Sequence, residues 1–394
     1  MKPLSERTQF LKQSDIRAVT QLVNQYNGIN LGQGICDLPT PDPVAEGAIE
    51  AINQHNSIYS YHSGISKLRK SVLDKINSFN GIPAKSEENI MISNGSTGAF
   101  VATVLSLLNP GDEVIQPEPF YGYHVNLLKI LGFKPVFVPT EDKTWAIDFD
   151  AIEAAITPKT KAIIVTTPGN PTGKVWTDEE LKKLLQLIKK HDLWAITDEV
   201  YEYMTYDGRS HNSLAAIDGA FERTITISSF SKTFNMTGWR LGYAAGPEEV
   251  IAKMGLISDL IYICPPTPLQ HGLHEGLQMS DEYFDDMLKN YHIRRDMFSE
   301  TMRKAGFSFT MPEGAYYLFA GFQELSGRVE GFENDKSACE TFIKEAGVAS
   351  VPGSAFFSNP EDGRYYLRFC YAKEMHILEK ACEGIRKFAK KWNG

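Results

Sequence analysis

The sequence has little of what marks membrane, secreted or nucleic-acid-binding proteins. No apolar run approaches the roughly 20 residues of a membrane-spanning helix, and the first residues, MKPLSERTQFLKQSD, contain no apolar segment of a signal peptide. The chain also lacks a dense basic block, and its 40 basic and 49 acidic side chains give a net charge of -9. Because nucleic-acid binders carry a basic footprint, we expect a soluble, cytoplasmic protein that binds small solutes, with no membrane and no nucleic acid as partner.

Motifs for metals and dinucleotides are missing as well. The five cysteines are scattered and odd in number, with no Cys-x-x-Cys pair, which disfavours zinc, iron–sulfur and redox chemistry. The nine histidines have no ligand-like spacing, and no Gly-x-Gly-x-x-Gly fingerprint occurs. The sequence therefore predicts no metal site. What is present is a chain of 394 residues, 42% of them hydrophobic, which is long enough for two domains.

Short apolar runs alternate with amphipathic stretches from about residue 90 to 250, which is the pattern of a mostly parallel sheet covered by helices. The candidate strands are EVIQ, PVFV, AIIVT, WAIT, TITIS and GYAAG. Between two of them, TDEELKKLLQLIKK predicts a helix that begins with a capping box formed by Thr177 and Glu180. The predicted fold class is α/β.

The rest of the chain predicts a second, smaller α+β domain. The apolar stripe in FDDMLKNYHIRRDMFSETM indicates a helix long enough to bridge two domains, and YYLF, YYLRFCYA and the closing EMHILEKACEGIRKFAKKW supply strands and a last helix. The stretch NLGQGICDLPTPDP reads as an extended arm rather than a core element. We predict an arm with part of the small domain (1–44), a large domain (45–282), and an interdomain helix with the small C-terminal domain (283–394).

Polar clusters directly follow three of the predicted strands. Asn170 follows AIIVT, Asp198 and Tyr201 follow WAIT, and Ser229 and Lys232 follow TITIS. In open α/β sheets ligands bind outside the carboxyl ends of the strands. We therefore expect these side chains to form one pocket.

A fourth cluster, SNGSTGAF, opens the helical run VATVLSLL. Free backbone N–H groups and the helix dipole at such a start favour an anion, so Gly95, Ser96 and Thr97 are candidates to hold a phosphate. An ordinary capped helix start is the alternative interpretation of the same residues.

The lysine of the third cluster stands in a nearly uncharged stretch, SSFSKTFNMTGWRLG, in which the next positive charge is Arg240. A pocket with a phosphate loop, a carboxylate, a phenol, an amide and a lysine suits pyridoxal phosphate. Lys232 would form a Schiff base with its aldehyde, and Asp198 would pair with its pyridine nitrogen. Ser229 and the planar guanidinium of Arg240 would bind the phosphate.

Together these motifs, from NLGQG at Asn30 to RFCYA at Arg368, resemble the fold-type I pyridoxal-phosphate enzymes of the class I/II aminotransferase family. The resemblance implies a sheet of the seven-stranded type in a large cofactor-binding domain. It also implies that Lys232 is the Schiff-base lysine, Asp198 the partner of the pyridine nitrogen, and Asn170 and Tyr201 donors to the 3-oxygen of the ring. Phosphate contacts are implied for Gly95, Ser96, Thr97, Ser229 and Arg240.

The same resemblance implies roles at the rim of the pocket. Tyr121 in PEPFYGY would stack on the cofactor ring, although Tyr123 and an ordinary core role remain alternatives. Tyr59 in YSYHSGISKLR resembles the tyrosine that reaches the phosphate of the neighbouring subunit, which implies a homodimer. The substrate's α-carboxylate would be clamped by Arg368, with the backbone near Gly34 and with Asn170.

The implied reaction is a ping-pong transamination between an L-amino acid and a 2-oxo acid. No arginine occurs between Arg240 and Arg294, and Thr97 stands where an aspartate-specific subgroup has lysine. Both features favour neutral, aromatic or sulfur-containing substrates, as in kynurenine, glutamine and methionine aminotransferases, while aspartate remains an alternative. A cysteine-conjugate β-lyase would use the same residues. A pyridoxal-phosphate-binding regulator is disfavoured, because roughly thirty residues before the arm are too few for a separate DNA-binding module.

Overall fold

The computed structural model describes residues 4–8 and 15–392. Its largest element is a seven-stranded sheet with the order β2-β8-β7-β6-β5-β3-β4. Only β8 runs antiparallel to its neighbours, and the other pairs are parallel. The predicted α/β class with a mostly parallel sheet is confirmed. The strands are β2 (Ile90–Ser93), β3 (Glu113–Glu118), β4 (Lys134–Pro139), β5 (Thr160–Thr166), β6 (Trp194–Asp198), β7 (Thr224–Ser229) and β8 (Gly242–Ala245).

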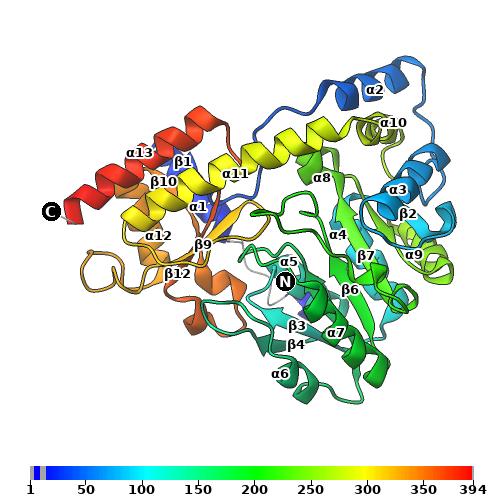
Figure 1. The fold of residues 1–394 in the computed structure, drawn as a ribbon, viewed down its shortest axis with the longest axis horizontal. Helices are drawn as coiled ribbons and strands as arrows, with labels where there is room; N and C mark the ends of the chain where they lie inside the picture. The colour runs from blue at the N-terminus through cyan, green and yellow to red at the C-terminus, as the bar shows by residue number, and fades with distance from the viewer. Residues whose placement is uncertain (1–3, 9–14, 393–394) are drawn as a thin grey trace.

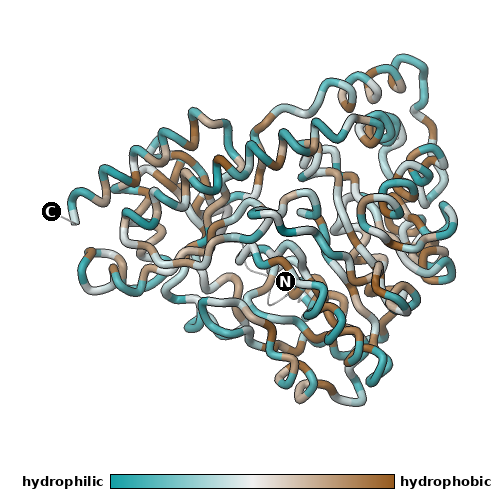
Figure 2. Tube along the Cα trace, viewed as in Figure 1, coloured by the Kyte–Doolittle hydropathy of each residue, from teal (hydrophilic) through white to brown (hydrophobic). Residues whose placement is uncertain are grey.

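Helices lie around this sheet, and hydrophobic residues concentrate along its strands (Figure 2). The predicted capping box is present, since the Thr177 side chain accepts a hydrogen bond from the N–H of Glu180 at the start of α7. Its apolar face, Leu181, Leu184, Leu185 and Ile188, is buried against the sheet. The helices of this part are α2 (Asp42–Asn53), α3 (Ser66–Ser78), α4 (Gly95–Leu107), α5 (Gly122–Leu131), α6 (Phe149–Ala154), α7 (Asp178–His191), α8 (Phe230–Thr233), α9 (Glu248–Tyr262) and α10 (Thr267–Leu277).

A second, three-stranded antiparallel sheet has the order β11-β12-β9 and belongs to the C-terminal part of the chain. Its strands are β9 (Tyr317–Gly321), β11 (Val351–Pro352) and β12 (Tyr366–Cys370). Near it, β1 (Ile29–Asn30) pairs in parallel with β10 (Val348–Ala349), so the N-terminal part of the chain joins the C-terminal one. The helices here are α1 (Asp15–Gln25), α11 (Asp281–Lys304), α12 (Asp335–Ala346) and α13 (Met375–Trp392).

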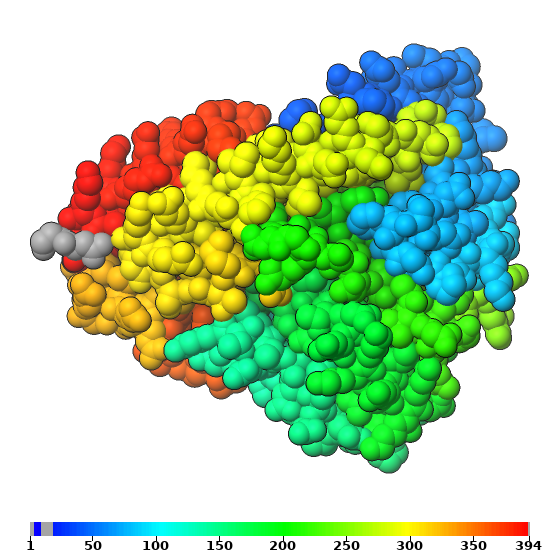
Figure 3. All heavy atoms as spheres, viewed as in Figure 1, coloured from blue at the N-terminus to red at the C-terminus, as the bar shows by residue number. Residues whose placement is uncertain are grey.

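The long helix α11 runs from the large sheet to the small one (Figure 1), as its apolar stripe predicts. At the other end of the molecule α2 and α10 pack side by side and form one corner of the surface (Figure 3). Short 3-10 turns complete the fold: η1 (Glu6–Thr8), η2 (Glu87–Asn89), η3 (Leu214–Ala216), η4 (Phe221–Arg223), η5 (Thr237–Trp239), η6 (Gly353–Phe356) and η7 (Pro360–Gly363). In the described part of the chain, no helix combines the length and apolarity required to cross a bilayer.

The arm after β1 is extended, as expected, but it is not peripheral. Leu31 is fully buried and Cys36 is 6% exposed, and both pack in the core cluster around the small sheet. The Pro and Gly content of the arm predicts its lack of helix, whereas the burial of its apolar side chains depends on contacts with residues more than 150 positions away.

Candidate active site

The three strand-end clusters meet at one edge of the large sheet. Strands β5, β6 and β7 are adjacent and parallel, so their carboxyl ends lie together. They open into a cavity of about 260 Å³ between the large and small sheets. Its lining includes Gly34, Ser96, Tyr121, Asn170, Asp198, Tyr201, Lys232 and Arg368. The prediction that segments distant in sequence form one pocket agrees with this geometry.

Lys232 lies on the single-turn helix α8, directly after β7. Ser229 caps that helix by accepting a hydrogen bond from the N–H of Ser231 at 3.1 Å. The Lys232 Nζ donates to the carbonyl oxygen of Gly34 at 3.0 Å and has no carboxylate partner among the residues described. Burial, with a smaller contribution from Arg368 and Arg240, lowers the pKa of Lys232 to about 8. A larger fraction of this amine is therefore neutral, and nucleophilic, near physiological pH than for an ordinary lysine.

Asp198 ends β6 and is buried beside a histidine that the sequence did not single out. The Nε2 of His124, on α5, lies 2.9 Å from Oδ2 of Asp198. The His124 ring stacks on Phe100 and meets Tyr121 edge-on, with centroids 4.7 and 5.3 Å apart. The contact between His124 and Asp198 therefore fixes one oxygen of the Asp198 carboxylate. The only sequence signal for His124 is its place three residues after Tyr121, at the start of a helix.

Tyr201 follows β6 and contacts a second unpredicted residue. Its hydroxyl lies 3.0 Å from that of Tyr317 on β9, and burial holds the pKa of Tyr201 well above its usual value. A Cβ at Gly34 would collide with the Tyr317 hydroxyl, so the arm approaches this tyrosine in a way that only glycine permits. Both phenols are therefore protonated at neutral pH and can donate hydrogen bonds.

Arg368 on β12 is a buried cation without a counter-charge. It is 3% exposed, and its guanidinium donates to Asn170 Oδ1 at 2.8 Å and to the Gly32 carbonyl at 2.7 Å. Its Nε is buried without a partner, and none of the described carboxylates pairs with it. A buried, uncompensated charge is costly. The site therefore favours an anionic ligand.

The start of α4 meets Arg240. A Cβ at Gly95, whose φ is +71°, would lie 2.5 Å from Nη2 of Arg240, and one at Gly242 would lie 2.8 Å from the N of Ser96. The first turn of α4 has no acidic residue and no side-chain cap from Asn94. Free amides, the helix dipole and a guanidinium thus converge, which is a cradle for an anion. Ser229 lies close by, because its hydroxyl donates to the Leu241 carbonyl.

Arg240 differs from Arg368 in its exposure. Its neighbours in GWRLG suggest an apolar environment, yet Arg240 is exposed, with φ of +56°. The cost of a buried, unpaired charge therefore favours an anionic ligand at Arg368 but does not apply to the exposed Arg240. Thr97, on the first turn of α4, is half-buried and is not part of the cavity lining.

Tyr121 and Tyr123 both line the cavity, with their rings nearly parallel and 5.2 Å apart. Tyr121 is half-buried, whereas Tyr123 is 54% exposed. Burial raises the pKa of Tyr121. Tyr121 is therefore the better-fixed ring. Tyr59 is 75% exposed and outside the cavity lining, so the fold of a single chain does not bring it to this site.

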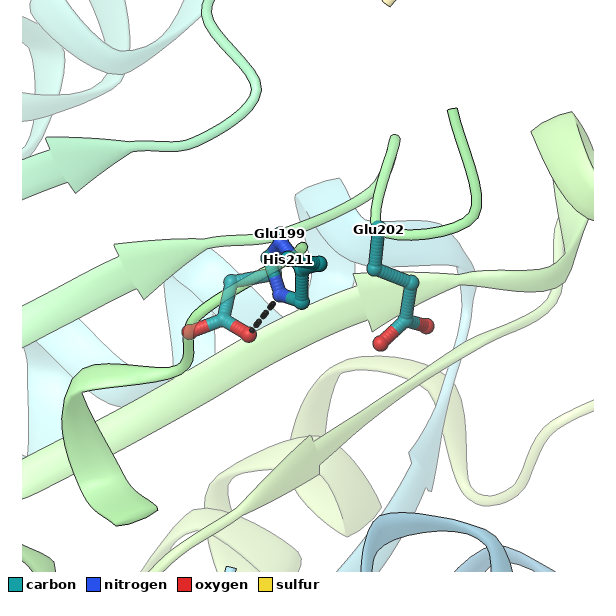
Figure 4. Close-up of side chains that lie close together, drawn as sticks. All are labelled: Glu199, Glu202 and His211. Carbon is teal, nitrogen blue, oxygen red and sulfur yellow. Dashed lines mark hydrogen bonds and ion pairs between the residues drawn. The ribbon is translucent and has the colours of Figure 1, made fainter. Parts of the chain in front are cut away.

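Glu199, Glu202 and His211 form a buried polar network (Figure 4), and Glu199 lies in the turn between Asp198 and Tyr201. Glu199, Glu202 and His211 offer ligand atoms within 4.8 Å of one another, as a metal site would. However, Glu199 accepts from Ser213 at 2.6 Å and pairs with His211 at 2.8 Å, and Glu202 pairs with the buried Lys75. Protein donors already occupy the oxygens that an ion would need. The network is better explained as the support that fixes the turn carrying Asp198 and Tyr201.

Comparison with known proteins gives a consistent answer. The family model "Aminotransferase class I and II" matches residues 26–385. The chain is 37% identical over 391 residues to aromatic-amino-acid aminotransferase 2 of Thermococcus litoralis, covering 98% of each. It is 34% identical to an aspartate aminotransferase of Pyrococcus abyssi, covering 98% of this chain and 97% of that protein. Escherichia coli YbdL, for which a methionine aminotransferase function is identified, superposes with a TM-score of 0.92 at 27% identity, covering 98% of this chain and 99% of YbdL.

The chain belongs to the class I and II aminotransferase family. It is a transferase of amino groups, and members of this family act on amino acids and 2-oxo acids, usually as dimers, and generally depend on pyridoxal phosphate. The residues present fit that cofactor. An amine of lowered pKa, a carboxylate and phenols line one cavity. Ser96 lines it too, and it belongs to the helix start at which Gly95 meets Arg240.

Proposed function

We propose that this protein is a pyridoxal-phosphate-dependent aminotransferase that transfers the amino group of a neutral, aromatic or sulfur-containing L-amino acid to a 2-oxo acid by a ping-pong mechanism. The observation that carries the proposal is that Lys232 and Arg368 line the same cavity. The pKa of Lys232 is lowered to about 8, and Arg368 is a buried guanidinium that lacks a counter-charge.

The residues divide the work of holding the cofactor. Arg240, Ser229 and the first turn of α4, with Gly95, Ser96 and Thr97, would bind its phosphate. Asp198, held by His124, would keep a proton on the pyridine nitrogen. Asn170 and Tyr201 would donate to the ring oxygen, and Tyr121 would cover one face of the ring. When bound, the cofactor supplies an aldehyde for amines and a ring that accepts electrons.

Substrate orientation and proton transfer fall to two side chains. Arg368 would grip the α-carboxylate with its planar fork, assisted by Asn170 and by the backbone near Gly34. This grip orients the bond between Cα and its hydrogen toward Lys232. The neutral Nζ of Lys232 then acts as the base that takes the Cα proton and returns it as an acid.

The walls of the cavity support a neutral side chain. Ile35, Tyr121, Tyr123, Val200 and Tyr317 give it a largely apolar and aromatic surface. Lys232 and Arg368 are the only cations that line it within the described part of the chain, and both already have roles. Nothing in this lining is left to pair with a second carboxylate of aspartate. Aspartate would need a cation from outside the cavity.

We also propose a homodimer in which Tyr59 reaches the phosphate of the neighbouring site. Tyr59 is exposed, and so are the apolar Ile58 at 80% and Leu260 at 86%. Exposed apolar side chains that gather in one patch mark surfaces that an assembly covers. The division into 1–44, 45–282 and 283–394 is likewise a proposal, supported by two separate sheets that α11 connects, and a cytoplasmic location stays a prediction.

The test is a panel of amino donors, each in a single half-reaction with the enzyme loaded with pyridoxal phosphate. The absorbance of the bound cofactor measures the rate of each half-reaction. Aromatic and sulfur amino acids should react fastest and aspartate slowest; the reverse order would refute the substrate class. Pyruvate and ammonia formed without an oxo acid would establish β-lyase chemistry instead. Borohydride reduction should leave a pyridoxyl mass on the peptide containing Lys232, and its absence would refute the mechanism.

A further inference from the structure

A second and larger cavity, of about 630 Å³, opens between the two sheets. None of its lining residues belongs to the lining of the active-site cavity. One wall comes from the end of β3, the end of β4 and the residues that follow it up to 145. The other comes from residues 308–310, β9 and residues 357–366. Its size falls within the roughly 300–1,000 Å³ of small-molecule sites, and the proposed transamination gives it no role.

The walls of this cavity are aromatic. Trp145 is 6% exposed and Phe319 is 2% exposed, with ring centroids 5.6 Å apart. Phe319 stacks on Tyr366 at 4.8 Å, and Trp145 meets Tyr366 nearly edge-on. Phe309, Phe357 and Tyr365 complete the aromatic lining. The negative faces of such rings attract cations.

Carboxylates supply most of the charge around these rings. Glu118, Asp142, Glu324 and Asp362 line the cavity, against Lys143 as the one cation among the lining residues. Glu118 is 7% exposed, and the hydrogen-bond partner of its carboxylate in the described structure is Ser358, whose N–H donates to Oε1. No described cation pairs with it. Burial raises the pKa of Glu118 in spite of the hydrogen bonds from Ser358, and Asp362 adds a smaller rise, as expected of a buried carboxyl that no cation neutralises.

We propose that this cavity binds a small organic cation, a substituted ammonium group on an aromatic body, with the ammonium near Glu118 and the body against Trp145 and Phe319. An anion would face several carboxylates. A neutral apolar molecule would bury the Glu118 carboxylate further without a partner, which is costly. An inorganic cation would leave the aromatic walls unused.

Two rings at this rim already accept cations. Arg303 lies over Phe309 with its Cζ 5.1 Å from the ring centroid, and Arg364 lies over Tyr365 at 4.9 Å. Neither arginine lines the cavity. Tyr366 is half-buried and has no arginine over its ring among the described pairs, so Tyr366 is the ring of this stack that a ligand can reach.

Any test must distinguish binding in this cavity from binding in the active site, because both cavities border the same face of the small sheet. Arg368 pairs with Phe319, and Tyr366 lies two residues from Arg368 on β12, so these side chains point to the same face. A suitable probe is benzyltrimethylammonium, which has neither a primary amine for the cofactor nor a carboxylate for Arg368. Benzyl alcohol is its uncharged counterpart.

The experiment is isothermal titration of the pyridoxal-phosphate-loaded enzyme with the two probes. We expect one saturable site per chain for the cation, with a dissociation constant below about 1 mM and at least about tenfold tighter than for benzyl alcohol. Glu118→Gln should weaken binding of the cation at least about fivefold, whereas Glu330→Gln, which removes an exposed carboxylate outside the cavity, should leave it unchanged. Binding of the cation should change the tryptophan fluorescence of the parent, and Trp145→Phe should abolish this change.

Equal affinity for the two probes, binding that does not saturate, or parental affinity in Glu118→Gln would overturn the proposal. If Glu118→Gln lowers the melting temperature, a double variant of two exposed lining residues, Glu324→Gln with Asp362→Asn, takes its place in the titration. We expect the same loss of affinity for the cation. Parental affinity in that double variant would equally count against the site. Because the probe cannot enter the transamination reaction, these outcomes are independent of the proposed function.

Discussion

The Nε2 of His124 lies 2.9 Å from Oδ2 of Asp198, and both side chains are buried. The two residues come from different elements, α5 and β6, so the contact joins the helix that begins beside Tyr121 to the strand end that carries Asp198. His124 thus connects two parts of the proposed cofactor site. It is a positioning residue for the carboxylate rather than a group that reaches the substrate.

Replacing His124 should therefore weaken the hold on Asp198 without removing the carboxylate. We expect His124→Phe to lower kcat/KM by about tenfold, because one charge-assisted hydrogen bond is worth roughly 1.5–3 kcal/mol and part of it is recovered by rearrangement. His124→Asn can still donate and should retain more activity. Steady-state kinetics, with the pH dependence of the bound cofactor's absorbance as a second readout, would distinguish a loss of Asp198 positioning from a loss of fold. Identical kcat/KM values for His124→Phe and His124→Asn would contradict the positioning role of His124.

Arg368 should discriminate by the carboxylate of the substrate. Arg368→Lys keeps the charge but loses the planar fork, so kcat/KM for an amino acid should fall about 100-fold. The amine that lacks the α-carboxylate should react equally slowly with the parent and the variant. Stopped-flow half-reactions with both compounds measure the difference. An equal loss for both would place Arg368 in a structural role.

The pKa of Lys232 makes a prediction about the stability of the cofactor-free protein. Its ordinary value of 10.5 falls to about 8 in the folded state, so the unfolded chain binds more protons between these two values and the free energy of unfolding rises with pH in that interval. Below pH 8 the buried ammonium is a full cost, at most about 3 kcal/mol. Lys232→Met should be more stable than the parent at pH 7, with a difference that shrinks toward pH 10. Urea unfolding at several pH values tests this, and a pH-independent difference would contradict it.

The buried network behind Asp198 should behave as a set of ion pairs and not as a metal site. Glu202 pairs with Lys75, accepts from Ser228 at 2.8 Å and from Asn80 at 2.9 Å, and burial of both partners makes a single substitution costly. Lys75→Met should lower the free energy of unfolding by about 3–5 kcal/mol, and the double variant Lys75→Met with Glu202→Gln by less. A chelator should leave the melting temperature unchanged. A large drop on chelation would show that an ion holds the cluster.

The sequence predicts most of those site residues whose position depends only on the nearby strand or helix. Asn170 and Lys232 follow strands of a mostly parallel sheet, and Asp198 ends one. Parallel strands bring their carboxyl ends to one edge, so the convergence of these residues is a consequence of the fold class. The start of α7 was equally predictable, because a capping box involves residues three positions apart. The edge strand β2 was not among the candidate strands, since four apolar or small residues directly before a glycine-rich helix start give little periodicity.

The residues that the sequence did not reveal depend on contacts between distant segments. Tyr317 meets Tyr201 across 116 positions, and His124 meets Asp198 from a different element. The exposure of Arg240 is also a tertiary property, because the apolar stretch GWRLG does not distinguish it from its fully buried neighbour Leu241. Local composition carries no record of such pairings. They arise from how α5, the arm and the small sheet pack against the large one.

Tyr59 offers the sharpest test of the proposed assembly, because it lies outside the cavity of its own chain and is 75% exposed. If it reaches the partner's phosphate, Tyr59→Phe should weaken cofactor binding about tenfold through the loss of one hydrogen bond to a charged group, while the protein remains dimeric. Leu260→Glu, on the exposed apolar surface, should instead shift the protein toward monomers and lose cofactor as a consequence. Tyr61→Phe is the matched control, because Tyr61 is also exposed, at 60%. Light scattering gives the mass and equilibrium dialysis the cofactor affinity. A monomeric parent, or a Tyr59→Phe variant that binds the cofactor as tightly as the parent, would refute a shared site.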